Sequence, residues 1–423
     1  MKLTWRLILP LSALSFLNSI DRVNVSYAAV KMNPDIGLTP ETYGFGITCF
    51  FLAYLVFQYP HASLLGRIGA KRWLFGSVFA WGVIGTAMAF VTNVHMFYAL
   101  RFLLGMAESG LAPGMTFLIS QWMPRRFRAL AVAVAIASVP FSMVVGGPLS
   151  GWMMDQVNPM GIAGWRWMFL LQGIPILLAA FVAHAYFVDR LEQAKWLSPA
   201  EKEWLAVELE KDRNASEAVG VARFSDVANS PTVWACAFAW LCIMTGAYGM
   251  VFWLPQVIDQ IAPGYTNLQI GLVSALPQAG LMAGMLVNAW HSDRTQERLW
   301  HVGLSALLAG VCLSLAASAG GGLIALVLLI AMGVGLGAAQ GAFWAIPTTL
   351  LQGRAALAGI ALINMFGTLG GVVGPALIGT VRERTGSFAA SIVAISVLLI
   401  AAFVLVMMLR AYQAKGVQSE RPA

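Results

Sequence analysis

The sequence predicts an all-α membrane protein of twelve transmembrane helices in two pseudo-symmetric six-helix bundles. Of its 423 residues, 59% are hydrophobic and only 11% are charged, whereas a soluble domain has about 25% charged residues. Apolar runs of about 20 residues recur along the chain, and each is long enough to cross a hydrocarbon core about 30 Å thick. These runs are continuous and lack the two-residue alternation of membrane barrels, so we expect helices.

Polar loops set the boundaries of the expected spans. In chain order the spans cover residues 7–28, 44–65, 73–93, 97–121, 129–152, 167–188, 232–258, 267–290, 300–319, 322–350, 355–381 and 386–410. The N-terminal bundle is then residues 1–188 and the C-terminal bundle is residues 232–412, followed by a tail over residues 413–423.

Lysine and arginine concentrate on one side of this arrangement. Twenty of them fall in segments on the side that holds both termini, and four fall on the other side, namely Lys31, Arg166, Arg382 and Arg384. Because positively charged loops stay in the cytoplasm, this bias predicts a multi-pass protein of the cytoplasmic (inner) membrane with both termini in the cytoplasm. The net charge of +7 therefore reflects membrane topology and does not indicate nucleic acid binding.

Residues 189–231 form one long charged stretch between the sixth and seventh spans. Ser198-Pro199-Ala200-Glu201 has the pattern of a capping box with proline at the first helical position, so a short helix is expected to begin there. We interpret the stretch as a solvated cytoplasmic linker between the two bundles.

The two halves of the chain carry related motifs. Gly147-Pro148-x-x-Gly151 in the fifth span recurs loosely as Gly374-Pro375-x-x-x-Gly379 in the eleventh, and Arg67 after the second span recurs as Arg294 after the eighth. Duplicated six-helix halves are a known transporter architecture. Glycines at such spacing most simply indicate close helix packing.

Only four charged side chains fall inside the apolar spans, and these are Asp21, Arg22, Arg101 and Glu108. An ionisable group at membrane depth costs roughly 2.5–3.5 kcal/mol on insertion scales, so it persists where it faces a partner or a polar pathway. With both acids ionised the cluster is net neutral, and an entering carboxylate would leave a costly uncompensated charge. Protonating one acid restores neutrality, so binding of an anion and of a proton is expected to be coupled.

The depths of these four groups predict which of them meet. At 1.5 Å per residue, Asp21 and Arg22 lie about 20 Å from the cytoplasmic surface, and Arg101 lies at about the same depth. Glu108 is on the same helical face as Arg101 and about 10 Å away, near the midplane. We therefore expect the first and fourth spans to pack together, with Arg101 near Asp21 and Arg22. The alternative is a set of buried ion pairs that only hold these two spans together.

Four motifs stand out along the chain. They are Arg101-Phe102-Leu103-Leu104-Gly105-Met106-Ala107-Glu108 followed by Ala112-Pro113-Gly114, Asn18-x-x-Asp21-Arg22, Phe252-Trp253-Leu254-Pro255 and Ser292-Asp293-Arg294. With these motifs the chain resembles a known family, the major facilitator superfamily, and specifically its branch of bacterial anion:cation symporters. The resemblance covers nearly the whole chain.

The resemblance implies roles for the charged residues. It implies Asp21 and Glu108 as the proton-coupling pair and Arg22 as a ligand of the substrate carboxylate. We also assign Arg101 to the substrate-binding site, and the alternative for Arg101 is a structural pair with Asp21. Arginine suits a carboxylate because its planar fork matches the two oxygens and stays charged.

The spans of the C-terminal bundle carry no charged side chain and offer neutral polar and aromatic groups instead. The resemblance favours Asn364 and Trp344 as substrate contacts, together with Tyr54 from the second span, and Gln278 is a further candidate. Tyr248 and Gln340 are other polar groups of this bundle. Core packing is the alternative for each of these residues.

The loop after the second span departs from the family pattern. A glycine and an aspartate usually precede the arginine of this loop, whereas Ala62 and Gly66 precede Arg67 here. The equivalent loop after the eighth span keeps Asp293 beside Arg294. We therefore expect gating to involve Asp293, Arg294 and Arg67, with the carboxylate supplied by Asp293 alone.

The sequence contains no nucleotide-binding loop and no metal-ligand spacing, so we expect neither an enzyme nor a cofactor. The expected function is that of a monomeric secondary transporter that imports an organic carboxylate by proton symport with alternating access. Sugar acids, hydroxy-dicarboxylates such as tartrate, and aromatic acids all fit as substrates. Its partners would be the substrate, protons and the lipid bilayer.

An exchanger or exporter of similar anions is the first alternative, since a similar fifth-span motif also occurs in some antiporters. A non-transporting membrane sensor is the second.

Overall fold

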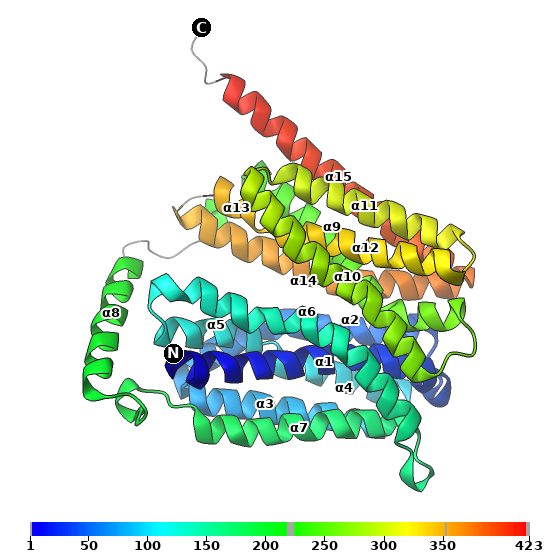
Figure 1. Ribbon diagram of the computed structural model, residues 1–423, viewed down its shortest axis with the longest axis horizontal. Coiled ribbons are helices and arrows are strands. Elements are labelled where there is room, and N and C mark those ends of the chain that lie inside the picture. The colour runs from blue at the N-terminus through cyan, green and yellow to red at the C-terminus, as the bar shows by residue number, and fades with distance from the viewer. Residues whose placement is uncertain (1, 218–223, 352, 420–423) are drawn as a thin grey trace.

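A computed structural model describes residues 2–217, 224–351 and 353–419, and these ranges form an all-helical structure (Figure 1). The α-helices are α1 (Leu9–Ile36), α2 (Pro40–Ile68), α3 (Ala70–Ala87), α4 (Val94–Glu108), α5 (Leu111–Trp122), α6 (Arg125–Gln156), α7 (Gly164–Tyr186), α8 (Pro199–Glu217), α9 (Pro231–Ile261), α10 (Asn267–Thr295), α11 (Leu299–Ser318), α12 (Gly322–Phe343), α13 (Ala345–Leu350), α14 (Gly353–Thr385) and α15 (Phe388–Ser419). A π-helical turn, η1 (Thr4–Ile8), precedes α1, and short 3₁₀ turns occur at η2 (Met88–Phe90), η3 (Pro159–Gly161), η4 (Leu191–Gln193) and η5 (Phe224–Asp226).

Eleven helical segments in the described ranges are long and apolar enough to cross a membrane. Helix α1 is not among them because Asn18, Asp21, Arg22 and Asn24 lower its hydropathy. It is nevertheless 28 residues long and packs against α6, α7 and α9 inside the helix bundle. With α1 included, the structure accounts for the twelve expected spans.

Two of the expected spans are interrupted. The fourth span consists of α4 and α5, which are separated at Ser109 and Gly110, and the tenth consists of α12 and α13, which are separated at Trp344. Several helices also extend further than predicted, and α1 continues to Ile36, where Gly37 ends it with φ +72°. Hydropathy marks only the segment that lies in hydrocarbon, whereas helical hydrogen bonding continues until a residue leaves the helical conformation.

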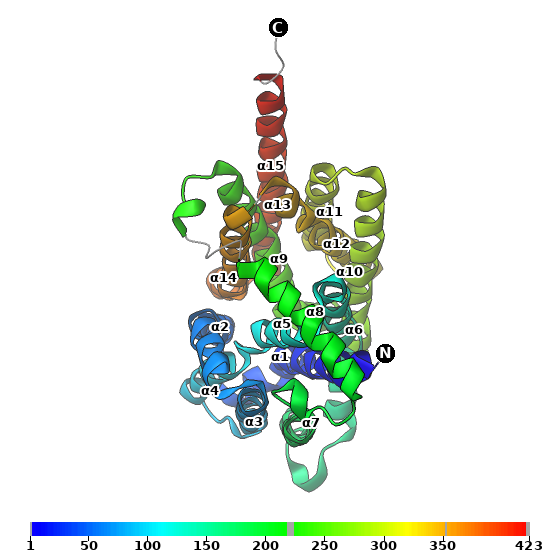
Figure 2. The ribbon, with the colours of Figure 1, turned by 90° about the vertical axis from the view of Figure 1, so that its left-hand side faces the viewer.

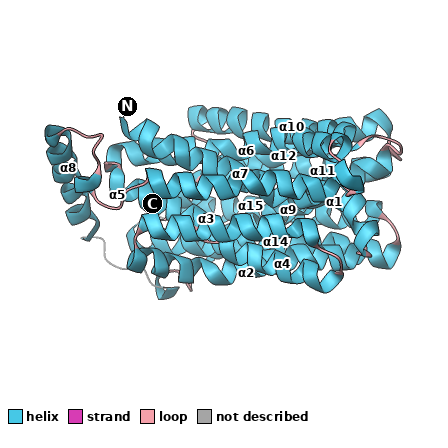
Figure 3. Cartoon of the chain, turned by 90° about the horizontal axis from the view of Figure 1, so that it is seen from below, coloured by secondary structure: helices cyan, strands magenta, loops and turns pink. Residues whose placement is uncertain are grey.

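The helices lie alongside one another (Figure 3), and they form two groups that are separated vertically in Figure 1. We call α1–α7 the N-half and α9–α15 the C-half, which lies above the N-half in Figure 1. Helix α8 crosses the end of the molecule at which the N-terminus lies, and Figure 2 looks onto this end. We call it the linker end and the opposite end, which holds the α1–α2 and α9–α10 loops, the far end.

The predicted capping box at the start of α8 is confirmed. The Glu201 amide donates to Ser198 Oγ at 3.3 Å, and the Ser198 amide donates to Glu201 Oε2 at 2.7 Å. Near its other end α8 is attached to the N-half, because Asp212 Oδ2 accepts hydrogen bonds from the Arg125 amide at 2.6 Å and from Arg128 Nη2 at 3.3 Å.

The two halves contact each other along α2 with α14 and along α6 with α10. Backbone contacts at glycines make this approach possible. Gly147 and Gly271 face each other so closely that a Cβ added to Gly147 would lie 2.8 Å from the Gly271 carbonyl oxygen, and one added to Gly44 would lie 2.7 Å from the Pro375 carbonyl oxygen. The repeated glycine motifs therefore pack close helices, as expected. Gly147, Gly151 and Gly379 join helices of opposite halves, whereas Gly374 packs against α9 within the C-half.

Candidate functional site

Arg22 on α1 and Glu108 at the end of α4 form a buried ion pair in the N-half. Arg22 Nη2 and Nε donate to Glu108 Oε2 at 3.0 and 3.2 Å, and Nη2 also donates to Asn18 Oδ1 at 3.2 Å. The Glu108 side chain is fully buried, whereas that of Arg22 is 19% exposed. Arg22 is therefore the member of the pair that a ligand can reach.

This pairing corrects the partners that helix rise predicted. We expected Arg101 beside Asp21 and Arg22, with Glu108 a further 10 Å away, but Glu108 is the residue that binds Arg22. Arg101 makes no ion pair or hydrogen bond with Asp21 within the described residues, but it lies, as expected, within electrostatic range of Asp21 and Arg22. The prediction used only the rise per residue along each helix. It neglected the tilt of the helices and the length of an arginine side chain, and together these bridge the distance expected between Arg22 and Glu108.

The two arginines contact the same aromatic ring. The Arg101 guanidinium lies 4.6 Å from the centre of the Phe50 ring, and that of Arg22 lies 5.6 Å from the same ring and 4.9 Å from the ring of Tyr54. Such contacts stabilise a cation in a dry environment. Tyr54 was a sequence candidate, but no pattern in the sequence distinguishes Phe50 from other core phenylalanines.

Several polar atoms of this cluster are buried without a hydrogen-bond partner in the described part of the chain. They are Arg101 Nε and Nη2, Glu108 Oε1 and Asn18 Nδ2. Buried polar atoms of native proteins are almost always hydrogen-bonded. Unused donors and an unused carboxylate oxygen at one place therefore mark a site that can bind a polar ligand and a proton.

Asp21 belongs to a separate hydrogen-bond network on the other side of α1. Its two oxygens accept from Trp81 Nε1 at 2.6 Å and from Asn24 Nδ2 at 2.9 Å. Asn24 Nδ2 also donates to Gln172 Oε1 at 3.1 Å, and Gln172 Nε2 donates to Ser150 Oγ at 2.9 Å. Successive helical residues point about 100° apart, which explains why Asp21 and Arg22 have different partners.

Sequence reasoning missed most of this network. Asn24 lies one turn after Asp21, and this spacing is a signal that could have identified it. Trp81 and Gln172 are on other spans, where nothing in the sequence relates them to Asp21.

The C-half candidates lie apart from the charged cluster. Gln278 is buried on α10 with its Oε1 unpartnered, Trp344 packs edge-on against Trp240 with ring centres 5.3 Å apart, and Asn364 is exposed on α14. No contact in the described ranges joins these three residues to Asp21, Arg22, Arg101 or Glu108.

Tyr248 is a C-half residue that the structure does bring to the cluster. Its ring centre lies 4.6 Å from that of Phe51 on α2, and its hydroxyl is within electrostatic range of Arg22. The candidate site therefore lies where α1, α2 and α4 of the N-half face α9 of the C-half.

The candidate gating residues lie at the linker end. Asp293 Oδ1 accepts from Arg298 Nη1 at 2.6 Å within the same loop, and its side chain is 73% exposed. Arg294 lies 5.7 Å from the Trp290 ring, and Arg67 is exposed in the last turn of α2. Within the described ranges, no contact joins these three residues across the two halves.

The loop that lacks an acid at Gly66 receives one from elsewhere in the chain. Asp189, which follows α7, accepts a hydrogen bond from the Lys71 amide at 2.7 Å in the first turn of α3. It packs beside Gly69, whose φ of +83° favours glycine. The sequence departure is thus compensated by a carboxylate that is distant in the chain.

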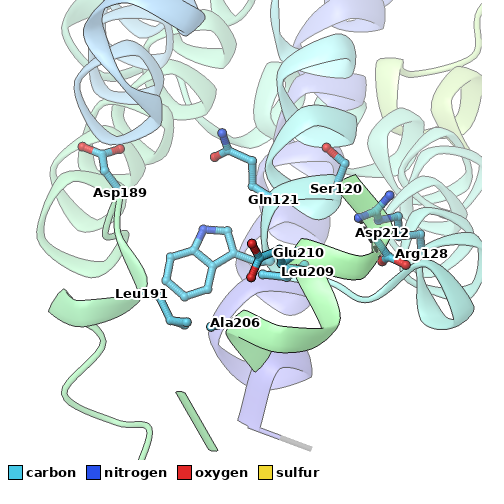
Figure 4. A pocket seen from close by; sticks show the side chains of 10 residues that line it. Ser120, Gln121, Arg128, Asp189, Leu191, Ala206, Leu209, Glu210 and Asp212 are labelled. Atoms are coloured by element: carbon cyan, nitrogen blue, oxygen red, sulfur yellow. Dashed lines mark hydrogen bonds and ion pairs between the residues drawn. The ribbon is translucent and has the colours of Figure 1, made fainter. Parts of the chain in front are cut away.

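A cavity of about 670 Å³ lies between α8 and the linker-end parts of α5 and α6 (Figure 4). Its polar lining includes Gln121, Arg128, Glu210 and Asp212, and the bond from Arg128 to Asp212 attaches α8 to α6. None of the four charged span residues lines it, so we do not include it in the candidate site. No metal-binding cluster of His, Cys, Asp and Glu occurs among the residues that the structure describes.

Comparisons with known proteins identify relatives over almost the whole chain. The sequence profile of the Major Facilitator Superfamily matches residues 11–375. A protein of Agrobacterium vitis that is provisionally named a tartrate transporter is 39% identical over 411 residues, covering 96% of this chain and 94% of its own. A quinolone resistance transporter of Acinetobacter baumannii is 34% identical, covering 95% and 92% of the two chains. Among solved structures, a bacterial homologue of the human lysosomal transporter Spinster matches with a TM-score of 0.80 at 16% identity, covering 96% of both chains.

Proposed function

Because the chain belongs to the major facilitator superfamily, whose members are multi-pass secondary transporters and not enzymes, we propose that it imports an organic dicarboxylate together with protons. The substrate class that we favour is a hydroxy-dicarboxylate such as tartrate. The name of the Agrobacterium relative and the two arginines of the cluster both support this choice.

The ion pair between Arg22 and Glu108 is the observation that carries the proposal. A proton on Glu108 removes its negative charge and weakens its hold on Arg22. A substrate carboxylate then takes the place of Glu108 at the guanidinium, whose fork matches both carboxylate oxygens. Each carboxylate needs one proton, so a dicarboxylate that enters with two protons, one on Glu108 and one on Asp21, leaves the net charge of the buried site unchanged.

The unpartnered atoms of the cluster suit the same exchange. Glu108 Oε1 makes no hydrogen bond of standard geometry in the described ranges, with the Asn18 amide beside it, and can take the proton. Arg101 supplies a second positive charge behind Phe50, which favours an anion with two carboxylates over one with a single carboxylate. Tyr54 and Tyr248 flank Arg22 and offer hydroxyl groups for hydroxylated substrates.

We further propose that the linker end faces the cytoplasm, because Lys and Arg are concentrated in its loops. The backbone contacts between the halves lie toward the far end, at Gly44 with Pro375 and at Gly147 with Gly271. The conformation is therefore one in which the site communicates with the cytoplasmic side. Alternating access requires a second conformation in which these far-end contacts separate.

Uptake into proteoliposomes tests the proposal. Radiolabelled tartrate should accumulate when the outside is acidified, and a protonophore should abolish the accumulation. Purified protein should also be stabilised against heating by tartrate but not by tartramide, its uncharged diamide. Uptake that does not depend on the proton gradient would exclude proton symport. Binding of tartrate without any transport would indicate a sensor.

Export is the second candidate function, and the similarity to a quinolone resistance transporter favours it. Quinolones carry an aromatic carboxylate, which the Arg22 site would also accommodate. Membrane vesicles of opposite orientation distinguish export from import. An exporter that exchanges drug for protons accumulates norfloxacin in everted vesicles whose interior is acidic, whereas a symporter that imports anions accumulates tartrate in right-side-out vesicles when the medium is acidic.

A further inference from the structure

Asp155, near the far end of α6 in the N-half, bonds to the first turn of α10 in the C-half. Its Oδ1 accepts from the Asn267 amide at 3.2 Å and from Asn267 Nδ2 at 2.7 Å, and its Oδ2 accepts from the Leu268 amide at 2.7 Å. Both carboxylate oxygens are therefore bonded to the opposite half.

The start of α10 needs these acceptors. The first backbone amides of a helix have no partner within the helix. A capping box serves part of the turn, because Thr266 Oγ1 accepts from the Gln269 amide at 3.2 Å and Gln269 Oε1 accepts from the Thr266 amide at 2.9 Å. The remaining amides, those of Asn267 and Leu268, both donate to Asp155, whose negative charge also suits the helix N-terminus.

Asp155 stands at the end of a line of close backbone contacts. One turn earlier on α6, Gly151 packs against the backbone of Asn267, and a further turn earlier Gly147 packs against Gly271. The glycines allow the two helices to approach, but they provide no directional bond. Asp155 provides such bonds where α6 and α10 meet at the far end.

We propose that Asp155 is the latch that holds the far end of the transporter closed. The inference rests on the alternating access proposed above. When the far end opens, α6 and α10 separate, and water replaces the carboxylate at the amides of α10. The bonds of Asp155 exist only in the closed state, so they shift the equilibrium toward it.

Asp35 provides a matched control at the same end of the molecule. It accepts a hydrogen bond from Trp165 Nε1 at 3.0 Å and lies 3.8 Å from Arg166 Nη2, and both partners belong to the N-half. Opening the far end leaves these contacts intact. Loss of the Asp35 charge should therefore leave the balance of conformations unchanged.

Distance measurements between spin labels test the latch. In a background with Cys49, Cys236, Cys242 and Cys312 replaced by serine, Met160→Cys and Leu323→Cys place labels at the far end on opposite halves, at positions that are 84% and 75% exposed. Phe127→Cys and Leu350→Cys report on the linker end in the same way. Measurements in nanodiscs without substrate make the result independent of which anion is carried and of proton coupling.

Asp155→Asn should raise the ratio of far-end-open to far-end-closed molecules about tenfold, since hydrogen bonds to a charged group are lost. The linker-end distance should shorten correspondingly.

Asn267→Pro removes two of the same bonds from the opposite side. Proline fits this first helical position, because Thr266 before it is already extended with φ −69° and ψ 162°. This variant should shift the ratio in the same direction, which keeps the test valid if Asp155→Asn folds poorly.

Asp35→Asn should reproduce the wild-type distance distributions. The latch is refuted if Asp155→Asn or Asn267→Pro folds and keeps the wild-type distributions. It is also refuted if Asp35→Asn shifts the ratio as far as Asp155→Asn, because the effect would then follow from loss of any far-end charge.

Discussion

Arg22 and Glu108 are 86 residues apart in the chain, and their side chains lie 3.0 Å apart in a buried ion pair. Asp21, the neighbour of Arg22, is bonded instead to Trp81 and Asn24. The two acids of the spans therefore have different surroundings. Glu108 faces the cation of Arg22, and its Oε1 makes no hydrogen bond of standard geometry in the described ranges. Both oxygens of Asp21 accept hydrogen bonds from N–H groups, and these groups have no proton to exchange. We therefore expect substitutions of the two acids to have different effects.

Arg22→Lys should weaken substrate binding by about 1.5–3 kcal/mol, the scale of a hydrogen bond to a charged group, because an ammonium loses the bidentate geometry. Calorimetric titration of purified protein with tartrate measures this loss. The diamide should bind the wild type poorly. Equal affinity of the wild type for acid and amide would remove Arg22 from the site.

Glu108→Gln should abolish accumulation driven by a proton gradient, because an amide cannot cycle a proton. Exchange of internal for external substrate should persist, since Arg22 stays available to the carboxylate. Counterflow in proteoliposomes separates the two activities. Retention of gradient-driven accumulation would mean that another group carries the proton.

Asp21→Asn should also abolish gradient-driven accumulation, and it should destabilise the fold as well. One N–H of the new amide must face an N–H of Trp81 or Asn24, which costs about 1–3 kcal/mol for an unsatisfied buried donor. Trp81→Phe removes one of these donors and should partly restore the thermal stability of the Asp21→Asn protein. Unchanged stability of Asp21→Asn in thermal denaturation would contradict the network.

Gly147→Ala should favour the conformation with an open far end, because an added Cβ would lie 2.8 Å from the Gly271 carbonyl oxygen and 2.7 Å from Tyr27 Oη. The far-end spin-label pair described above measures the shift, and transport should slow. Gly66→Ala is the matched control, since an added Cβ there meets nothing within 4 Å. A shift of the same size in both variants would show that glycine flexibility, and not close approach, is responsible.

Asp293→Asn should slow transport while leaving substrate affinity in detergent within a few-fold of the wild type. In the present conformation Asp293 pairs with Arg298 in its own loop at 2.6 Å, and we expect it to exchange this partner when the linker end closes. Removing the carboxylate therefore disfavours the closed linker end. The linker-end label pair checks this, and normal transport with unchanged distances would show that Asp293 has no part in gating.

The membrane class, the helical fold and the members of the charged cluster could all be predicted from the sequence. These predictions rest on composition along the chain, namely the continuous apolar runs, the bias of Lys and Arg, and the small number of ionisable residues inside the spans. Placing an apolar segment in water or a charged group in lipid costs free energy, and this cost applies to each segment separately. The capping box at Ser198 and Glu201 is likewise local, and for that reason it was predicted correctly.

Which of these groups meet depends on tertiary packing. The partners of Arg22, Asp21 and Asp155 come from helices whose relative rotation and tilt depend on packing across the whole bundle. The same holds for Asp189, which substitutes for the acid missing at Gly66 from more than a hundred residues away. Side-chain contacts between spans carry no periodic signal in a single sequence, so the pairing of charges follows from three-dimensional packing.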